Sequence, residues 1–210
     1  MNIADKTPNF LLECERLVEG KQVGVLYHFT TAYAGSEIVF SDKLIPKEGG
    51  GISFDGESYV IDRFRDWVSL TRNYNLHATA NAGGANQSWG EMRIAFDGDI
   101  LSNNHKIEPY HDDDGVLTRH DGQAEERIVG GAKKIAAAII QIDFNTQSFI
   151  DHETNFDQWV SPPNSHEREK YRRMAEEDVT AFIRAFHEKG IICNIVKDFS
   201  VPVSRRKVNK

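Results

Sequence analysis

Three short segments of the sequence carry side chains that could do chemistry, and each alternates apolar with polar residues. They span residues 26–30, 67–73 and 123–128. Such alternation is typical of half-buried β-strands, in which side chains two positions apart share a face. The shared faces would carry His28 with Thr30, Ser69 with Thr71, and Gln123 with Glu125. An imidazole, a pair of hydroxyls and a carboxylate on neighbouring strands would form a polar cleft for a small polar ligand.

The elements that must position these residues follow from hydrophobic spacing and from turn residues. Strands are predicted at 23–30, 68–71, 92–96, 125–129, 136–144 and 191–196. Helices are predicted at 9–18, 33–44 and 58–67, and a long one runs from Asn164, which forms a plausible capping pair with Glu167, to Lys189. Segment 97–99 reads as a turn, 75–90 as a loop that could serve as a lid, and 102–122 as a long polar surface excursion. Two prolines at 162 and 163 mark the clearest boundary.

Length and charge narrow the function classes. The 210 residues suffice for one large domain or a domain with an appendage, and the net charge of −7 provides no global positive field for nucleic acid or anionic lipid. This balance favours a protein partner over a nucleic acid. No apolar run is long enough for a signal peptide or a membrane span, and two distant cysteines fit reduced thiols, so we expect a cytoplasmic protein without membrane contact.

No metal is expected, because the candidate ligands have the wrong spacing. Residues 112–115 (Asp-Asp-Asp-Gly) lack the alternating oxygen ligands and the closing glutamate of a calcium loop. His105, His111 and His120 offer no pair three or four residues apart on a predicted helix.

The order of a His-x-Thr, a Ser-x-Thr and a Gln-x-Glu strand resembles the ADP-ribosyltransferase superfamily, and most of all its small bacterial and phage members. These include DarT-type enzymes and an anti-CRISPR ADP-ribosyltransferase. The resemblance covers roughly residues 23–144. It implies an α+β fold, namely a split, bent β-sandwich of two small sheets with flanking helices, and NAD as a substrate in the cleft between the sheets. Residues 1–160 would form the catalytic domain, and 161–210 a helix–strand extension packed on it.

The resemblance also implies roles for residues at matching positions. Glu125 would be the catalytic carboxylate and Gln123 would contact the acceptor, although the adjacent Glu126 leaves open which glutamate is catalytic. His28 would bind the adenosine ribose. The other residues implied in NAD binding are Phe29, Thr30, Ser69, Thr71 and either Arg72 or Arg93, which could hold the pyrophosphate.

Other functions remain open at this point. The implied activity is mono-ADP-ribosylation of a macromolecule with release of nicotinamide. A non-catalytic protein-binding module on the same fold, of a phage anti-host or virion kind, would carry the same motifs. An NAD glycohydrolase is a further alternative, as is an RNA 2′-phosphotransferase, whose richer basic pocket the sequence does not supply. Neither the acceptor nor the oligomeric state follows from the sequence.

Overall fold

Seven strands form the central sheet of the computed structural model, which describes residues 24–46, 52–54, 57–59, 67–72, 74, 90–109, 125–155 and 164–204. Their order is β11 (Cys193–Ile195), β10 (Ile139–Phe144), β6 (Met92–Asp97), β1 (Val25–Thr30), β5 (Trp67–Thr71), β8 (Glu125–Val129) and β7 (Ile107–Pro109). Neighbouring strands are antiparallel except β10 and β11. Two small sheets pair β2 (Lys43–Leu44) with β9 (Ala132–Lys133), and β3 (Ile52–Phe54) with β4 (Glu57–Tyr59).

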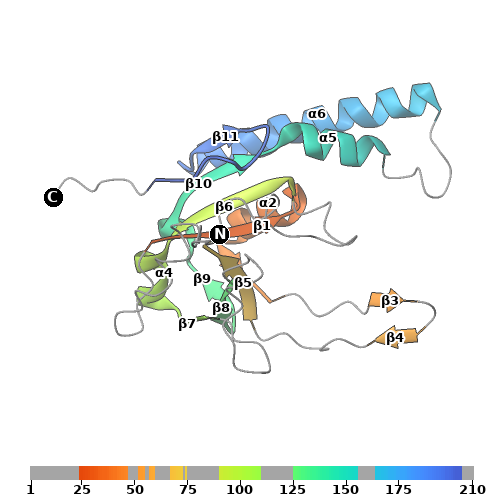
Figure 1. Ribbon diagram of the computed structural model, residues 1–210. Helices are drawn as coiled ribbons and strands as arrows, with labels where there is room; N and C mark the ends of the chain where they lie inside the picture. Colours follow the sequence, from red (N-terminus) through yellow and green to blue (C-terminus); the bar gives the residue numbers. More distant parts are fainter. Residues whose placement is uncertain are drawn as a thin grey trace, which may run out of the picture.

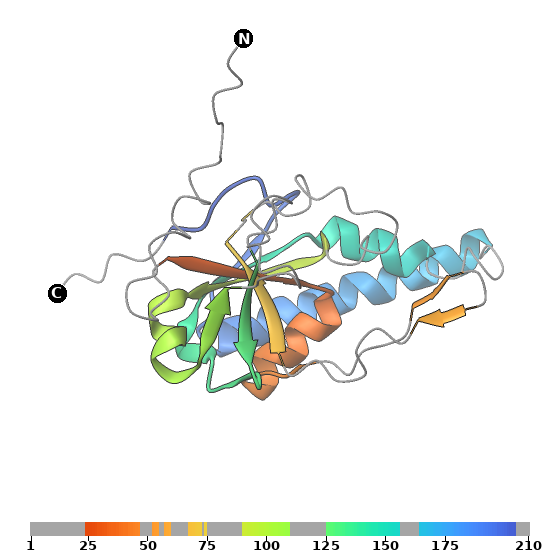
Figure 2. The same cartoon turned by 60° about the horizontal axis from the view of Figure 1, so that its bottom comes forward.

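The central sheet bends where β1 meets β5. Strand β1 pairs with β6 along its whole length, but with β5 only through Tyr27 and Thr71. Figures 1 and 2 show β5 and β8 running at a steep angle to β1 and β6. The sheet therefore consists of two halves, β11-β10-β6-β1 and β5-β8-β7, and the predicted α+β fold with a split, bent sheet is confirmed.

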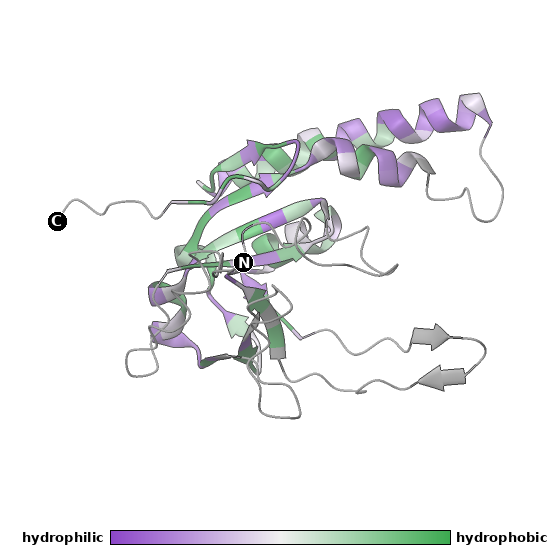
Figure 3. Cartoon of the chain, in the orientation of Figure 1, coloured by the Kyte–Doolittle hydropathy of each residue, from purple (hydrophilic) through white to green (hydrophobic). Residues whose placement is uncertain are grey.

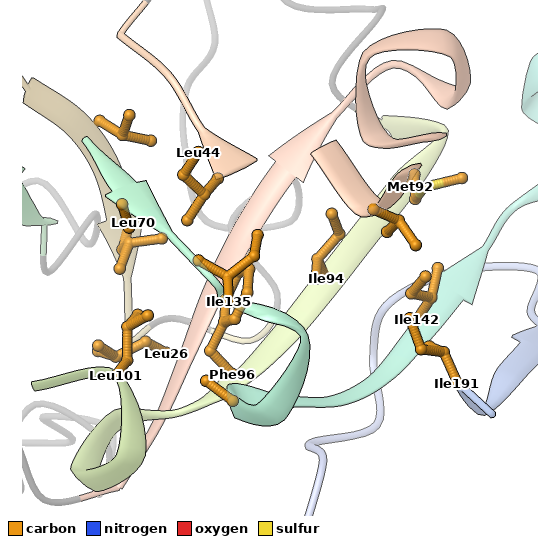
Figure 4. Close-up of a cluster of buried hydrophobic side chains, with 14 of the residues drawn as sticks. Leu26, Leu44, Leu70, Met92, Ile94, Phe96, Leu101, Ile135, Ile142 and Ile191 are labelled. Carbon is orange, nitrogen blue, oxygen red and sulfur yellow. The ribbon is translucent and has the colours of Figure 1, made fainter. Parts of the chain in front are cut away.

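One continuous apolar core lies on one face of both halves. It is built by alternate residues of the central strands, among them Leu26, Leu70, Ile94, Phe96 and Ile142 (Figure 4). Burying such aliphatic and aromatic groups is the main favourable contribution to folding, at about 25 cal/mol per Å² of apolar surface removed from water. The opposite face of β1 and β6 carries a smaller cluster, whose buried members are Tyr27, Phe29, Ala95, Phe199 and Val203. A C-terminal segment of the chain thus covers the face that the helices leave open.

Helices α2 (Ala32–Ser41), α5 (Thr146–Asn155) and α6 (Ser165–Glu188) pack against the larger core. Helix α2 begins directly after β1, and α5 packs along α6. Figure 3 shows hydrophilic residues at the free end of the α5–α6 pair and hydrophobic ones where it reaches the sheet. Among the described residues, no helix combines the length and apolarity that a bilayer span requires.

Several predicted elements differ from the structure. The strands around 23–30, 92–96 and 125–129 and the long helix after Asn164 are confirmed. The helix predicted at 33–44 ends at Ser41, and Leu44 belongs to β2. The helix predicted at 58–67 is wrong at its start, which is in β4, and the turn at 97–99 is the start of α4 (Gly98–Asn104). The strand predicted at 136–144 begins with the short 3₁₀ helix η3 (Ala136–Ala138), and α5 was not predicted. The predicted helix at 9–18 and most of the two predicted loops lie outside the described residues.

Candidate functional site

The three strands that carry the predicted site residues are direct neighbours in the sheet. Strands β1, β5 and β8 lie side by side, although they are far apart in the sequence. Tyr27 pairs with Thr71, and Thr71 pairs with Glu125. Since neighbouring strands are about 4.8 Å apart, the backbone of Glu125 lies about 10 Å from that of β1. The sequence-based expectation of neighbouring strands is therefore confirmed for the strands that carry His28, Thr71 and Glu125.

The residues of β1 alternate between the two faces of the sheet. His28 is half-buried and pairs with Ile94, and Thr30 is half-buried and pairs with Met92, so both lie on the face of the larger core. Phe29 points to the other face, where its ring meets the ring of Phe199 edge to face at 5.4 Å. With 8% of its surface exposed, Phe29 is a packing residue in this structure.

Thr71 and Arg72, at the end of β5, are both buried. Because Thr71 is paired with Tyr27, its side chain lies on the face of Tyr27, opposite to that of His28. The imidazole of His28 and the hydroxyl of Thr71 therefore lie on opposite faces of the sheet where β1 meets β5. The expectation that they share one crevice is not supported. Ser69 occupies the register position opposite Arg127.

The predicted catalytic glutamates are the first two residues of β8. Glu125 stands opposite Thr71, while Glu126 stands opposite Leu70 and, on the other side, opposite Pro109. Glu125 is therefore in the backbone row that contains Thr71 and Tyr27, and Glu126 is in the row next to it. Gln123 lies outside the described residues.

Arg93 is engaged inside the fold and is not placed to hold a pyrophosphate. Its guanidinium donates to Asp143 through Nε (3.0 Å) and Nη2 (2.5 Å). Its remaining N–H groups donate to the carbonyl oxygens of Tyr74, Phe199 and Val201. A guanidinium has five N–H donors, so this arrangement uses all of them. Arg93 is only 2% exposed, so its role in this structure is to hold the fold together. Arg72 remains as the candidate for binding the pyrophosphate.

A buried carboxylate next to β1 was not predicted from the sequence. Glu91 is 1% exposed and accepts hydrogen bonds from the backbone N–H of Ala32 and from Nδ1 of His152, both at 2.7 Å. Nearby, the phenol of Tyr33 donates to Asp178, and burial together with this bond raises the pKa of Tyr33. A single acidic residue before a strand has no periodicity or motif that would distinguish it from a solvated one.

The described residues outline one cavity elsewhere. It has a volume of about 530 Å³ and lies between α5 and α6, where it is lined by Thr154, Ser165, Arg168, Glu169 and Arg172. None of these residues belongs to β1, β5 or β8. The part of the chain that the structure describes holds no group of three or more His, Cys, Asp or Glu side chains placed to bind a metal ion.

Comparisons with known proteins give one structural similarity. No family model matches the chain, and no curated protein matches it. Among solved structures, the chain is similar to the Thermus sp. 2.9 DarT in complex with NAD⁺, with a TM-score of 0.45 and 13% sequence identity, over 88% of this chain and 99% of that one.

Proposed function

We propose that this chain is an NAD-dependent mono-ADP-ribosyltransferase, which transfers ADP-ribose to a macromolecular acceptor and releases nicotinamide. The observation that carries the proposal is the adjacency of β1, β5 and β8 at the bend of the sheet. His28 and Thr30 belong to β1, Ser69 and Thr71 to β5, and Glu125 to β8, although about 100 residues separate the first of them from the last.

The proposed roles follow the chemistry of each residue type. Cleavage of the bond between nicotinamide and ribose develops positive charge on the ribose, and the carboxylate of Glu125 would stabilise that charge. His28 would bind the adenosine ribose, and Ser69 with Thr71 would line the NAD pocket. Arg72 would clamp the pyrophosphate, since Arg93 has its donors engaged elsewhere. Gln123 would contact the acceptor.

The register at the bend constrains this assignment. His28 and Thr71 lie on opposite faces, so NAD would have to contact β1 and β5 from different sides of the crossing, or one of the two residues has another role. This observation favours the second candidate, a protein-binding module that keeps the fold without catalysis. The net charge of −7 favours a protein over a nucleic acid, either as the acceptor of a transferase or as the partner of a binding module.

One experiment separates the candidates. The full chain is incubated with NAD, released nicotinamide is quantified, and lysate proteins and nucleic acids are examined for an added ADP-ribose mass. Glu125→Gln should lower nicotinamide release by a factor of about 10² to 10⁴, as removal of a positioned catalytic carboxylate does. Glu126→Gln, the same charge change on the next residue, is the matched control and should stay close to the wild-type rate.

The outcomes are distinct. Absence of both nicotinamide release and a mass shift with the wild-type chain would contradict the proposal and leave the binding module. Release of free ADP-ribose without a labelled acceptor would indicate an NAD glycohydrolase. An equal loss of activity in both glutamate variants would remove the assignment of Glu125 as the catalytic carboxylate.

A further inference from the structure

Glu91 is a carboxylate buried almost completely between three elements. One oxygen accepts the backbone N–H of Ala32, the first residue of α2, at 2.7 Å. The other lies 2.7 Å from Nδ1 of His152 on α5. Burying a carboxylate is unfavourable unless hydrogen bonds or opposite charge compensate for lost hydration. The N-terminus of a helix supplies such compensation, because its N–H groups and its dipole attract negative charge.

This carboxylate fixes the corner at which β1 passes into α2. Only Thr31 separates Ala32 from Thr30, the last residue of β1. Thr31 itself is the N-cap of α2, and its hydroxyl accepts the N–H of Ala34 at 3.3 Å. The side chain of Glu91 thus holds the chain two residues beyond Thr30 and four beyond His28.

Glu91 also ties this corner to α5. Its carbonyl oxygen accepts the N–H of Asn145, whose side-chain oxygen in turn accepts the N–H of Ser148 in the first turn of α5. Further along the same helix, the imidazole of His152 reaches the carboxylate, with 41% of its side chain exposed. Charged or titratable groups close to the pair include Glu153 on α5, Asp178 on α6 and Tyr33 on α2.

We propose that Glu91 is a positioning residue for NAD binding, which acts through the β1–α2 corner on His28 and Thr30 and is supported by His152. This inference rests on the proposed function. Loss of the bond to Ala32 would let the end of β1 move relative to β6, and a ligand contact on His28 would weaken. Glu125 belongs to β8, which is two strands away from β1 in the sheet, so the chemical step itself would keep its geometry.

Steady-state kinetics of nicotinamide release test this inference. Glu91→Gln should raise KM for NAD about tenfold and leave kcat nearly unchanged, because a contact made equally to bound NAD and to the transition state is lost. His152→Ala should act in the same direction. His152→Asn should restore a near wild-type KM, because the amide nitrogen of asparagine can take the place of Nδ1. Glu153→Gln is the matched control, since it removes a neighbouring charge on α5 without touching the bond to Ala32.

The half-exposed His152 keeps the test valid if Glu91→Gln does not fold. Unchanged KM in His152→Ala and in any folded Glu91→Gln, with an active wild type, would overturn the inference alone. So would an equal KM change in Glu153→Gln, or a loss confined to kcat. A wild-type chain that neither releases nicotinamide nor shows an NAD-dependent rise in melting temperature would overturn the proposed function and this inference with it.

Discussion

At the scale of single residues, the fold makes the ionised form of Glu153 on α5 less favourable than it is in the unfolded chain. The pKa of Glu153 is raised, first because burial removes hydration and then because Glu91 and Asp178 are nearby, while His152 opposes the shift. A carboxyl group whose pKa is higher in the folded state than in the unfolded state lowers stability when it is ionised. Its unfavourable contribution is present at neutral pH and disappears as pH falls below the ordinary glutamate range.

Glu153→Gln should therefore raise the melting temperature at pH 7 to 8, and the gain should shrink as the pH approaches about 4. Thermal unfolding of both proteins across this range measures the difference. Glu177→Gln, on the exposed surface of α6, is the control and should be nearly neutral throughout, because its ion pair with Arg173 is solvent-exposed. An increase in melting temperature that stays the same at every pH would show that the ionisation of Glu153 is not its cause.

Residue patterns predicted which strands are neighbours more reliably than which way the side chains point. Alternation along β1 correctly groups His28 with Thr30, but it does not say on which face of the sheet that pair lies relative to Thr71. The relation depends on the Tyr27–Thr71 pairing across the bend, a non-local contact. Arg93 was misassigned for the same reason, because its partner Asp143 comes from another strand 50 residues later.

At the scale of elements, the turn between β8 and β9 provides a sharp test. Gly130 and Gly131 both have positive φ, at 71° and 73°. A Cβ at Gly131 would lie closer to the backbone oxygen of Leu44 than van der Waals contact allows, and a backbone atom cannot move aside as the end of a side chain can. A Cβ at Gly130 would meet nothing within 4 Å. Both alanine variants incur a conformational cost of about 1 kcal/mol, and Gly131→Ala adds a steric clash.

Gly131→Ala should thus lower the free energy of unfolding by clearly more than Gly130→Ala does, as measured by urea denaturation of the two variants. It should also disturb the β2–β9 pairing, in which Leu44 faces Ala132. Equal destabilisation of the two variants would mean that the cost comes only from the positive φ, and that the turn moves away from Leu44 to relieve the clash.

Helices and strands could be predicted where residues close together in the sequence determine where the element begins or ends. The capping box is present in α6, with Asn164 and Glu167 each bonded to the backbone of the other. Helix α5 was missed because its ten residues contain only Phe149 and Ile150 as large apolar groups, too few for a helical stripe. At Asp97 the sequence pattern was ambiguous. An aspartate that accepts the N–H groups of the residues two and three positions later either closes a turn or, as here, caps a helix.

At the scale of the whole molecule, the C-terminal segment 199–203 completes the second face of the sheet without forming a helix or strand. Arg93 binds two of its carbonyl oxygens, and the N–H of Val203 donates to the phenol oxygen of Tyr27 at 3.1 Å. The guanidinium of Arg93 also lies 5.3 Å from the ring centre of Phe199. No periodicity in the sequence predicts this segment, because its contacts with Arg93 and Tyr27 are made to residues more than 100 positions earlier.

The segment should therefore contribute to global stability through Phe199, which is 3% exposed, and not through Val201, which is 71% exposed. Phe199→Ala removes a ring that packs on Phe29 and Arg93, and truncation of a buried phenylalanine costs about 3 to 5 kcal/mol. Val201→Ala, two residues away in the same segment, should stay within about 0.5 kcal/mol of the wild type, since it leaves the carbonyl contact to Arg93 intact. Chemical denaturation of both variants measures the difference. Similar, small effects would show that the segment is attached to the sheet without supporting it, and a large loss only in Phe199→Ala would make these residues part of the folding unit.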